Sequence, residues 1–177
     1  MAGTTLFESP IGPIGLAWTI AGISALQLPA ATEAATRALL RRRGGAEQSD
    51  PPPTIGAAIL RIQALLGGTP DDLADIALDL AGVTPFELSV YDLARKIPPG
   101  RTLTYGAIAA RLGDPAASRA VGVALGRNPV AIIIPCHRVL AAGGADGGFS
   151  APGGIATKRR LLEIEGAITA QPSLFSA

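Results

Sequence analysis

The stretch "YGAIAARLGDPAASRAVGVALG", residues 105–126, decides how the second half of the chain folds. Its opening residues suit a helix, and Gly113 suits the left-handed position that commonly ends one. Asp114 is a typical N-cap and Pro115 a typical first helical residue, so a further helix is expected to run to about Gly126. The pattern is that of a helix-turn-helix, which DNA-binding proteins share with helical hairpins that bind no DNA.

A further helix is expected just before this stretch. Thr84, Pro85 and Glu87 supply an N-cap, a proline at the first helical position and a capping-box acid. Apolar residues then recur at helical spacing until the sequence Pro98-Pro99-Gly100, where a helix must end. These elements predict a mainly α-helical C-terminal domain over residues 84–177.

The first part of the chain, residues 1–83, has the pattern of a small sheet with helices. Alternating apolar residues and the Ala21-Gly22 turn indicate strands, and an acid followed by three arginines marks the ends of a helix. The expected strands are 16–20, 24–28 and 75–80, and the expected helices are 33–43 and 55–66. We therefore predict an α/β N-terminal domain.

Composition excludes several classes of site. The 177 residues include one cysteine and one histidine, too few for an internal disulfide or a four-ligand zinc site. The longest apolar run, Val130 to Ile134, is too short to span a membrane, and the residues around Glu8 lack the basic start of a secretory signal. We expect a cytoplasmic protein without a metal, a cofactor or a membrane partner.

The two halves differ in charge. Residues 1–83 hold five arginines against eight acidic residues, whereas residues 84–177 hold ten basic against six acidic residues. A basic second half is consistent with a polyanionic partner and equally with scattered solvated charges.

The single cysteine and the single histidine are adjacent in "IIIPCHRVL", residues 132–140. A free cysteine is most often an inert buried side chain, but His137 and Arg138 would lower the thiol pKa if they came near. In an extended chain Cys136 and His137 point to opposite faces, so a direct thiol–imidazole pair would need a bend in the chain, and a relay would need a water molecule.

Glu165 is placed unusually for a carboxylate. It falls in the last turn of a helix expected to close at Gly166, where a negative charge opposes the helix dipole. Either this is a solvated helix end, or the carboxylate is held by an imidazole or guanidinium, for which His137 and Arg138 are the candidates.

Several motifs occur together and in order: Pro-Gly, Thr-Tyr-Gly, Arg-Ala-Val-Gly, Asn-Pro, Pro-Cys-His-Arg and a closing Glu-Gly. With them, the segment from Phe86 to Gly166 resembles the C-terminal domain of O6-alkylguanine-DNA alkyltransferases, also called methylated-DNA–protein-cysteine methyltransferases. The segment "SPIGPIGLAW", residues 9–18, is similar to the start of that family's ribonuclease-H-like N-terminal domain.

The resemblance implies direct-reversal DNA repair. Cys136 would take the alkyl group from O6-alkylguanine, and from O4-alkylthymine, in a flipped nucleotide, irreversibly and once per molecule. His137 would act through a water molecule with Glu165 supporting it. Tyr105 would press on the target phosphate and donate toward guanine N3.

The remaining site residues follow from the same resemblance. Arg119 would fill the gap left in the base stack, and Asp114 would lie on the same DNA-binding surface. The flipped base would be read beside Phe149 by main-chain groups, among them those of Val139 and Ser150. Asn128 and Arg138 would support the structure of the site.

The implied partner is double-stranded DNA approached through the minor groove, and the protein would act as a monomer. Within the resemblance there are departures: Tyr91 stands where many relatives have tryptophan, Phe149 replaces a frequent tyrosine, and Ala151-Pro152 lengthen the loop relative to shorter members. Two other functions remain open: a helix-turn-helix regulator, and a sensor that binds alkylated DNA without transfer.

Overall fold

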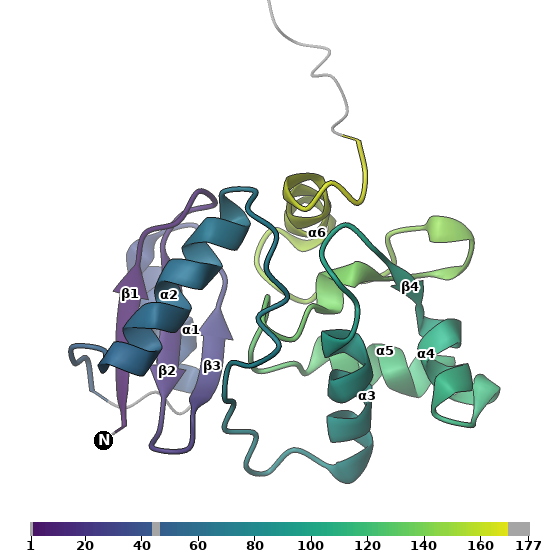
Figure 1. Ribbon diagram of the computed structural model, residues 1–177, viewed down its shortest axis with the longest axis horizontal. Helices are drawn as coiled ribbons and strands as arrows, with labels where there is room; N and C mark the ends of the chain where they lie inside the picture. Colours follow the sequence, from purple (N-terminus) through teal and green to yellow (C-terminus); the bar gives the residue numbers. More distant parts are fainter. Residues whose placement is uncertain (1, 44–46, 170–177) are drawn as a thin grey trace, which may run out of the picture.

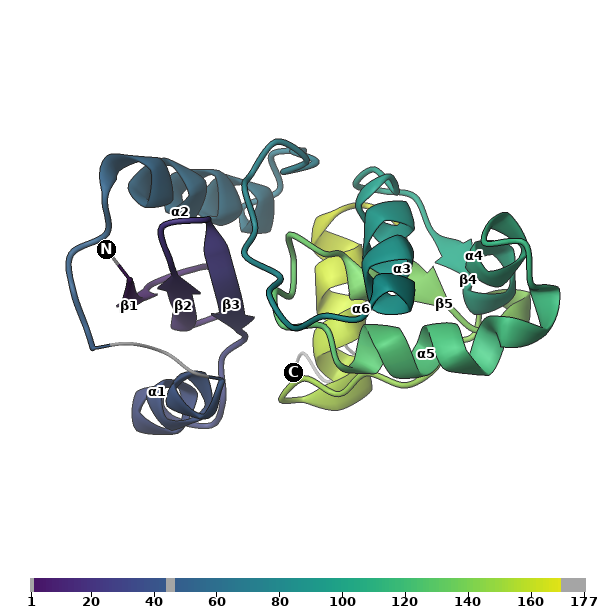
Figure 2. The ribbon, with the colours of Figure 1, turned by 90° about the horizontal axis from the view of Figure 1, so that it is seen from below.

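The computed structural model describes residues 2–43 and 47–169 (Figure 1). A three-stranded antiparallel sheet in the order β1-β2-β3 lies in the first part of the chain. Figure 2 shows α1 and α2 on opposite faces of this sheet. The elements are β1 (Gly3–Phe7), β2 (Ile14–Trp18), β3 (Ile23–Gln27), α1 (Glu33–Arg42) and α2 (Pro53–Leu66).

Successive side chains along each strand point to opposite faces of the sheet, and both faces are packed. Ala17 and Ala25 pack with Leu40 of α1, and the small side chains let this helix approach the sheet closely. On the other face, Leu16 and Trp18 join the main core. The predicted α/β character with a small antiparallel sheet is therefore confirmed for this part of the chain.

The predicted strand over 75–80 is wrong. Only Leu78 pairs with the sheet, as an isolated bridge to Ile23, and Asp79 N donates to the Ile23 carbonyl at 2.9 Å. The Asp79 side chain then accepts from Ala81 N at 3.1 Å, which turns the chain away before a ladder can form. The sheet gains its third strand instead from β1, which the sequence did not predict.

The second part of the chain is mainly helical, as predicted. Thr84 accepts from Glu87 N, and the Glu87 carboxylate accepts from Thr84 N at 3.1 Å, so the predicted capping box is confirmed. The helices are α3 (Pro85–Arg95), α4 (Tyr105–Arg111), α5 (Ser118–Gly126) and α6 (Gly154–Ile164).

The connection between α4 and α5 follows the sequence signals with one correction. Gly113 adopts φ 85°, and the Asp114 side chain accepts from Ala116 N at 3.0 Å. Asp114 thus caps a short 3₁₀ turn, Pro115–Ala117, and the α-helix begins only at Ser118.

Long-range pairing joins the two parts. Leu26 in β3 forms a bridge with Val130, and Leu26 N donates to the Pro129 carbonyl at 2.9 Å. Short parallel strands, β4 (Leu103–Thr104) and β5 (Val139–Leu140), bring the start of α4 beside the segment that follows the cysteine. One continuous apolar core therefore extends through both parts of the chain.

Among the described residues, no helix has the length and apolar character that a membrane span requires.

Candidate active site around Cys136

The chain bends at the cysteine. Residues Cys136–Arg138 form a 3₁₀ turn after Pro135, with Arg138 N donating to the Pro135 carbonyl at 2.9 Å. Cys136 remains partly exposed, whereas the His137 and Arg138 side chains are each 1% exposed. The chain is therefore bent at Cys136, and the alternation expected of an extended segment does not apply there.

Asn128 fixes the approach to the bend. Its side-chain amide donates to the Ile134 carbonyl at 2.8 Å and accepts from Val130 N at 2.9 Å. Between these contacts Ile132 adopts φ 72°, a left-handed conformation that a β-branched residue rarely takes. The surrounding hydrogen bonds therefore hold the segment before Cys136 in a strained turn.

The thiol is not activated in the way the sequence suggested. Burial raises the pKa of Cys136, and this outweighs the opposing effects of the Asn128 side chain, the Lys158 charge and nearby backbone N–H groups. The sequence made a lower thiol pKa conditional on His137 and Arg138 coming near, and both side chains instead turn into the core and bind the Glu165 carboxylate. A base is needed to remove the thiol proton at neutral pH.

Glu165 is held by both neighbours of the cysteine. Its carboxylate lies 2.9 Å from His137 Nε2 and accepts from Arg138 Nε and Nη2, each at 2.8 Å. The predicted contact of Glu165 with an imidazole or guanidinium is thus confirmed. Burial favours the neutral carboxyl, but the hydrogen bonds from His137 and Arg138 prevail and lower the pKa of Glu165 to about 2.

The same contacts set the protonation of His137. Burial lowers the pKa of the imidazole and outweighs the opposing effect of Glu165, so the ring is neutral. An ionised Glu165 can only accept, so Nε2 carries the proton and Nδ1 holds the lone pair. His137 Nδ1 is buried without a hydrogen-bond partner among the described residues, and is therefore available as a base.

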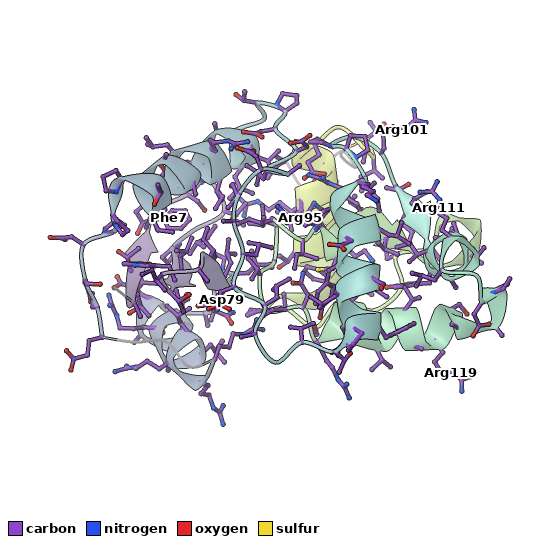
Figure 3. The ribbon with its side chains drawn as sticks, turned by 60° about the horizontal axis from the view of Figure 1, so that its bottom comes forward. Phe7, Asp79, Arg95, Arg101, Arg111 and Arg119 are labelled. Atoms are coloured by element: carbon purple, nitrogen blue, oxygen red, sulfur yellow. The ribbon has the colours of Figure 1, made fainter. Side chains whose placement is uncertain are left out.

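Cys136 opens on a cavity of about 560 Å³, within the usual range of small-molecule pockets. Of the predicted site residues, Tyr105, Arg119, Phe149 and Ser150 line this cavity with the cysteine. Arg119 is exposed on α5, and Figure 3 shows it at the end of the molecule away from the sheet, where Arg101 and Arg111 also lie.

Tyr105 begins α4, with Thr104 as the N-cap. Its hydroxyl lies 3.4 Å from the Gly148 carbonyl, and burial raises its pKa. Gly147 has φ 67°, and a Cβ there would lie 2.9 Å from the tyrosine ring. A glycine at this position is therefore needed for the loop to pass the ring.

Lys158 was not predicted as a site residue. It is fully buried, its Nζ donates to the Val139 carbonyl at 2.6 Å, and it lies 5.8 Å from the centre of the Tyr105 ring. The signal in the sequence was a cation at helical spacing with Leu161 and Leu162, on the buried face of α6.

Other predicted residues lie outside the cavity. Val139 is fully buried in β5 and Asp114 is exposed in the turn before α5, so neither lines it. Ser150 lines the cavity, and its hydroxyl donates to the Gly126 carbonyl at 2.9 Å, which ties the loop to the end of α5. Within the described part of the chain, no three His, Cys, Asp or Glu side chains come together as metal ligands.

Comparison with known proteins agrees with this geometry. Residues 85–167 match the family model described as the DNA-binding domain of 6-O-methylguanine DNA methyltransferase. Methylated-DNA–protein-cysteine methyltransferase of Mycobacterium tuberculosis is 39% identical over 89% of this chain and 88% of its own, and that of Methanothermobacter thermautotrophicus is 36% identical over 89% and 81%.

Solved structures agree over nearly the whole chain. The crystal structure of Mycobacterium tuberculosis OGT in complex with DNA is similar with a TM-score of 0.73, at 36% identity over 93% of each chain. O6-methylguanine-DNA methyltransferase from Pyrococcus kodakaraensis is similar with a TM-score of 0.69, at 30% identity over 94% of this chain and 99% of its own.

Proposed function

Because the chain belongs to the family of methylated-DNA–protein-cysteine methyltransferases, we propose that Cys136 is the residue that takes the alkyl group from O6-alkylguanine in DNA. One observation carries this assignment. The only cysteine of the chain opens on a cavity lined by Tyr105 and Arg119, while the turn behind it holds the buried His137–Glu165 pair. Nothing in the site favours a regulator or a sensor that lacks transfer.

The chemistry is an in-line displacement. His137 Nδ1 takes the thiol proton through a water molecule, and Glu165 stabilises the imidazolium that forms. A bond forms between Cys136 Sγ and the alkyl carbon as the bond from that carbon to guanine O6 breaks. Tyr105 donates toward guanine N3 as the base leaves, and the guanine ends with the proton that the thiol lost.

A thioether is stable, and no group in the site regenerates the thiol, so the transfer is irreversible and each molecule acts once. The same attack on O4-alkylthymine requires only that the smaller base reach the same position. Arg138 holds Glu165 in place from within the core, and Asn128 holds the turn before the thiol.

DNA is bound by the helix-turn-helix made of α4, the Asp114 turn and α5. Entry from the minor groove suits a repair protein, because this groove carries little sequence information and damage occurs in any sequence. The damaged nucleotide rotates out of the stack, Arg119 fills the space that it leaves, and Tyr105 presses on the target phosphate. The base is read beside Phe149 by main-chain groups of the loop at Ser150 and of Val139.

We assign residues 1–83 to a ribonuclease-H-like domain and residues 84–177 to the domain that binds DNA and carries out transfer. The protein acts as a monomer, because the thiol and the other residues of the site come from a single chain. A single cysteine, which forms no internal disulfide, is consistent with the cytoplasm.

The direct test is incubation of the protein with duplex DNA containing O6-methylguanine, followed by intact mass and peptide mapping. We expect a gain of one methyl group per molecule, located on Cys136, and none in Cys136→Ala. Multiple turnovers, or a methyl group on another residue, would refute the assignment.

A further inference from the structure

Cys136 lies between two hollows. Beside the cavity that contains Tyr105 and Arg119, a second recess of about 370 Å³ reaches toward the first part of the chain. Leu125, Cys136, Phe149 and Ser150 line both of them. A base that fills the first cavity therefore leaves the recess open to whatever group is attached to its O6 atom.

The recess is basic at its far side. Arg42 and Arg43, from the end of α1, belong to its lining, which contains no aspartate or glutamate. Within residues 2–43 and 47–169, neither arginine forms an ion pair with a carboxylate. Their charge is therefore available to an anion that enters from the thiol side.

Arg43 is tied to the segment that fixes the thiol. Its Nη1 donates to the Asn128 and Pro129 carbonyls at 3.2 and 3.1 Å. Asn128 lines the same recess as Cys136, and its side chain acts to lower the pKa of the thiol against the effect of burial. The Arg43 guanidinium and the thiol also interact electrostatically, since a charge on Cys136 acts to raise the pKa of Arg43 against the effect of burial.

We propose that this recess selects anionic O6-alkyl groups, with Arg43, assisted by Arg42, binding a carboxylate such as that of O6-carboxymethylguanine. The inference rests on the proposed function and names a substrate class for the same site. The loop that forms one wall of the recess contributes Ala151 and Pro152 to its lining.

A positive charge in the recess would assist the transfer of a carboxymethyl group. Cys136 Sγ attacks the methylene carbon of the O6–CH₂–COO⁻ group, the bond from carbon to O6 breaks, and S-carboxymethylcysteine forms while guanine receives the thiol proton. A thiolate approaching this carbon also approaches a carboxylate, and the two negative charges repel each other. A guanidinium beside the carboxylate reduces this repulsion as the sulfur–carbon bond forms.

The test compares single-turnover rates on two duplexes that differ only in charge, one with O6-carboxymethylguanine and one with its neutral amide, O6-carbamoylmethylguanine. Because both arginines are partly solvated, we expect Arg43→Gln to lower the carboxylate-to-amide rate ratio about tenfold, and Arg42→Gln to lower it less. Using a ratio removes effects of either variant on folding, DNA binding or the thiol. Arg43→Lys should retain much of the carboxylate-to-amide rate ratio that Arg43→Gln loses.

Arg41→Gln is the matched control, because Arg41 precedes these residues in α1 but lines a different cavity. We expect its ratio to equal that of the unaltered protein. A ratio unchanged within threefold in Arg43→Gln and in the double variant would overturn the proposal. Failure of the proposed function would look different: the unaltered protein would then transfer no methyl group from O6-methylguanine to Cys136.

Discussion

Replacement of Glu165 by glutamine tests the buried ionic cluster behind the thiol. The carboxylate is 3% exposed and accepts two hydrogen bonds from Arg138, whose side chain is 1% exposed. Glutamine keeps the shape but removes the charge, which leaves the Arg138 cation buried without a counter-ion. Breaking a buried ion pair in this way costs about 3–5 kcal/mol.

The lowered pKa of Glu165 leads to a similar magnitude. Folding lowers this pKa from 4.5 to about 2, which corresponds to about 3 kcal/mol of stability. As the pH falls, the unfolded state binds the proton first, so the contribution is complete above pH 4.5 and is lost as the pH falls through 2. We therefore expect a loss of about 3 kcal/mol at pH 7 that decreases by about half between pH 5 and pH 3.

Urea unfolding followed by the fluorescence of Trp18 measures this loss, because Trp18 is the only tryptophan and is 3% exposed. Glu163→Gln, which removes a partly exposed carboxylate from α6, is the matched control and should change stability little. A loss below about 1 kcal/mol in Glu165→Gln, or one independent of pH, would show that the cluster does not stabilise the fold as described.

Two further predictions concern the DNA-binding half. Arg119→Ala should slow transfer most from well-paired duplex DNA and much less from single strands, because only the duplex requires the base stack to be opened. Arg111→Ala is the control, measured on the same two substrates. Equal slowing of Arg119→Ala on both substrates would mean that Arg119 is a phosphate contact and does not fill the stack. Thr84→Ala removes the capping box of α3 and should lower the free energy of unfolding by about 1 kcal/mol and Tm by roughly 2–4 °C. Thr84→Ser keeps a hydroxyl at the N-cap and should retain the stability. An unchanged Tm in Thr84→Ala would contradict the assigned role.

Local signals predicted the helices well. The capping box at Thr84 and the sequence Gly113-Asp114-Pro115 act through hydrogen bonds within a few residues, so the sequence contains all the partners. The strand predicted over 75–80 failed because the same kind of local hydrogen bond was overlooked. Its alternating pattern suited a sheet, but Asp79 used its carboxylate for a turn and allowed only one bridge.

Some contacts of the candidate site were predictable from the sequence, but its electrostatics were not. Cys136 and His137 are adjacent and are the only residues of their types in the sequence, which made them candidates for the site. Glu165 was a candidate because its carboxylate is unfavourable at the C-terminal end of a helix unless a cation binds it. Neither the direction of the thiol pKa nor the positions of Lys158 and Arg43 followed from the sequence. Both depend on contacts between segments far apart in the chain, which no local pattern encodes.

The outer edge of β3 bears on how the protein resists aggregation. A strand edge with unpaired N–H and C=O groups is a template for association with other chains. Here Leu26 N is bound by Pro129 and Ile23 N by Ala77, so segments from later in the chain cover this edge. A proteolytic fragment that ended before Pro129 would lose the cover at Leu26 and expose an apolar edge. The segment that leads to Cys136 thus also covers an edge at which the sheet could otherwise pair with another chain.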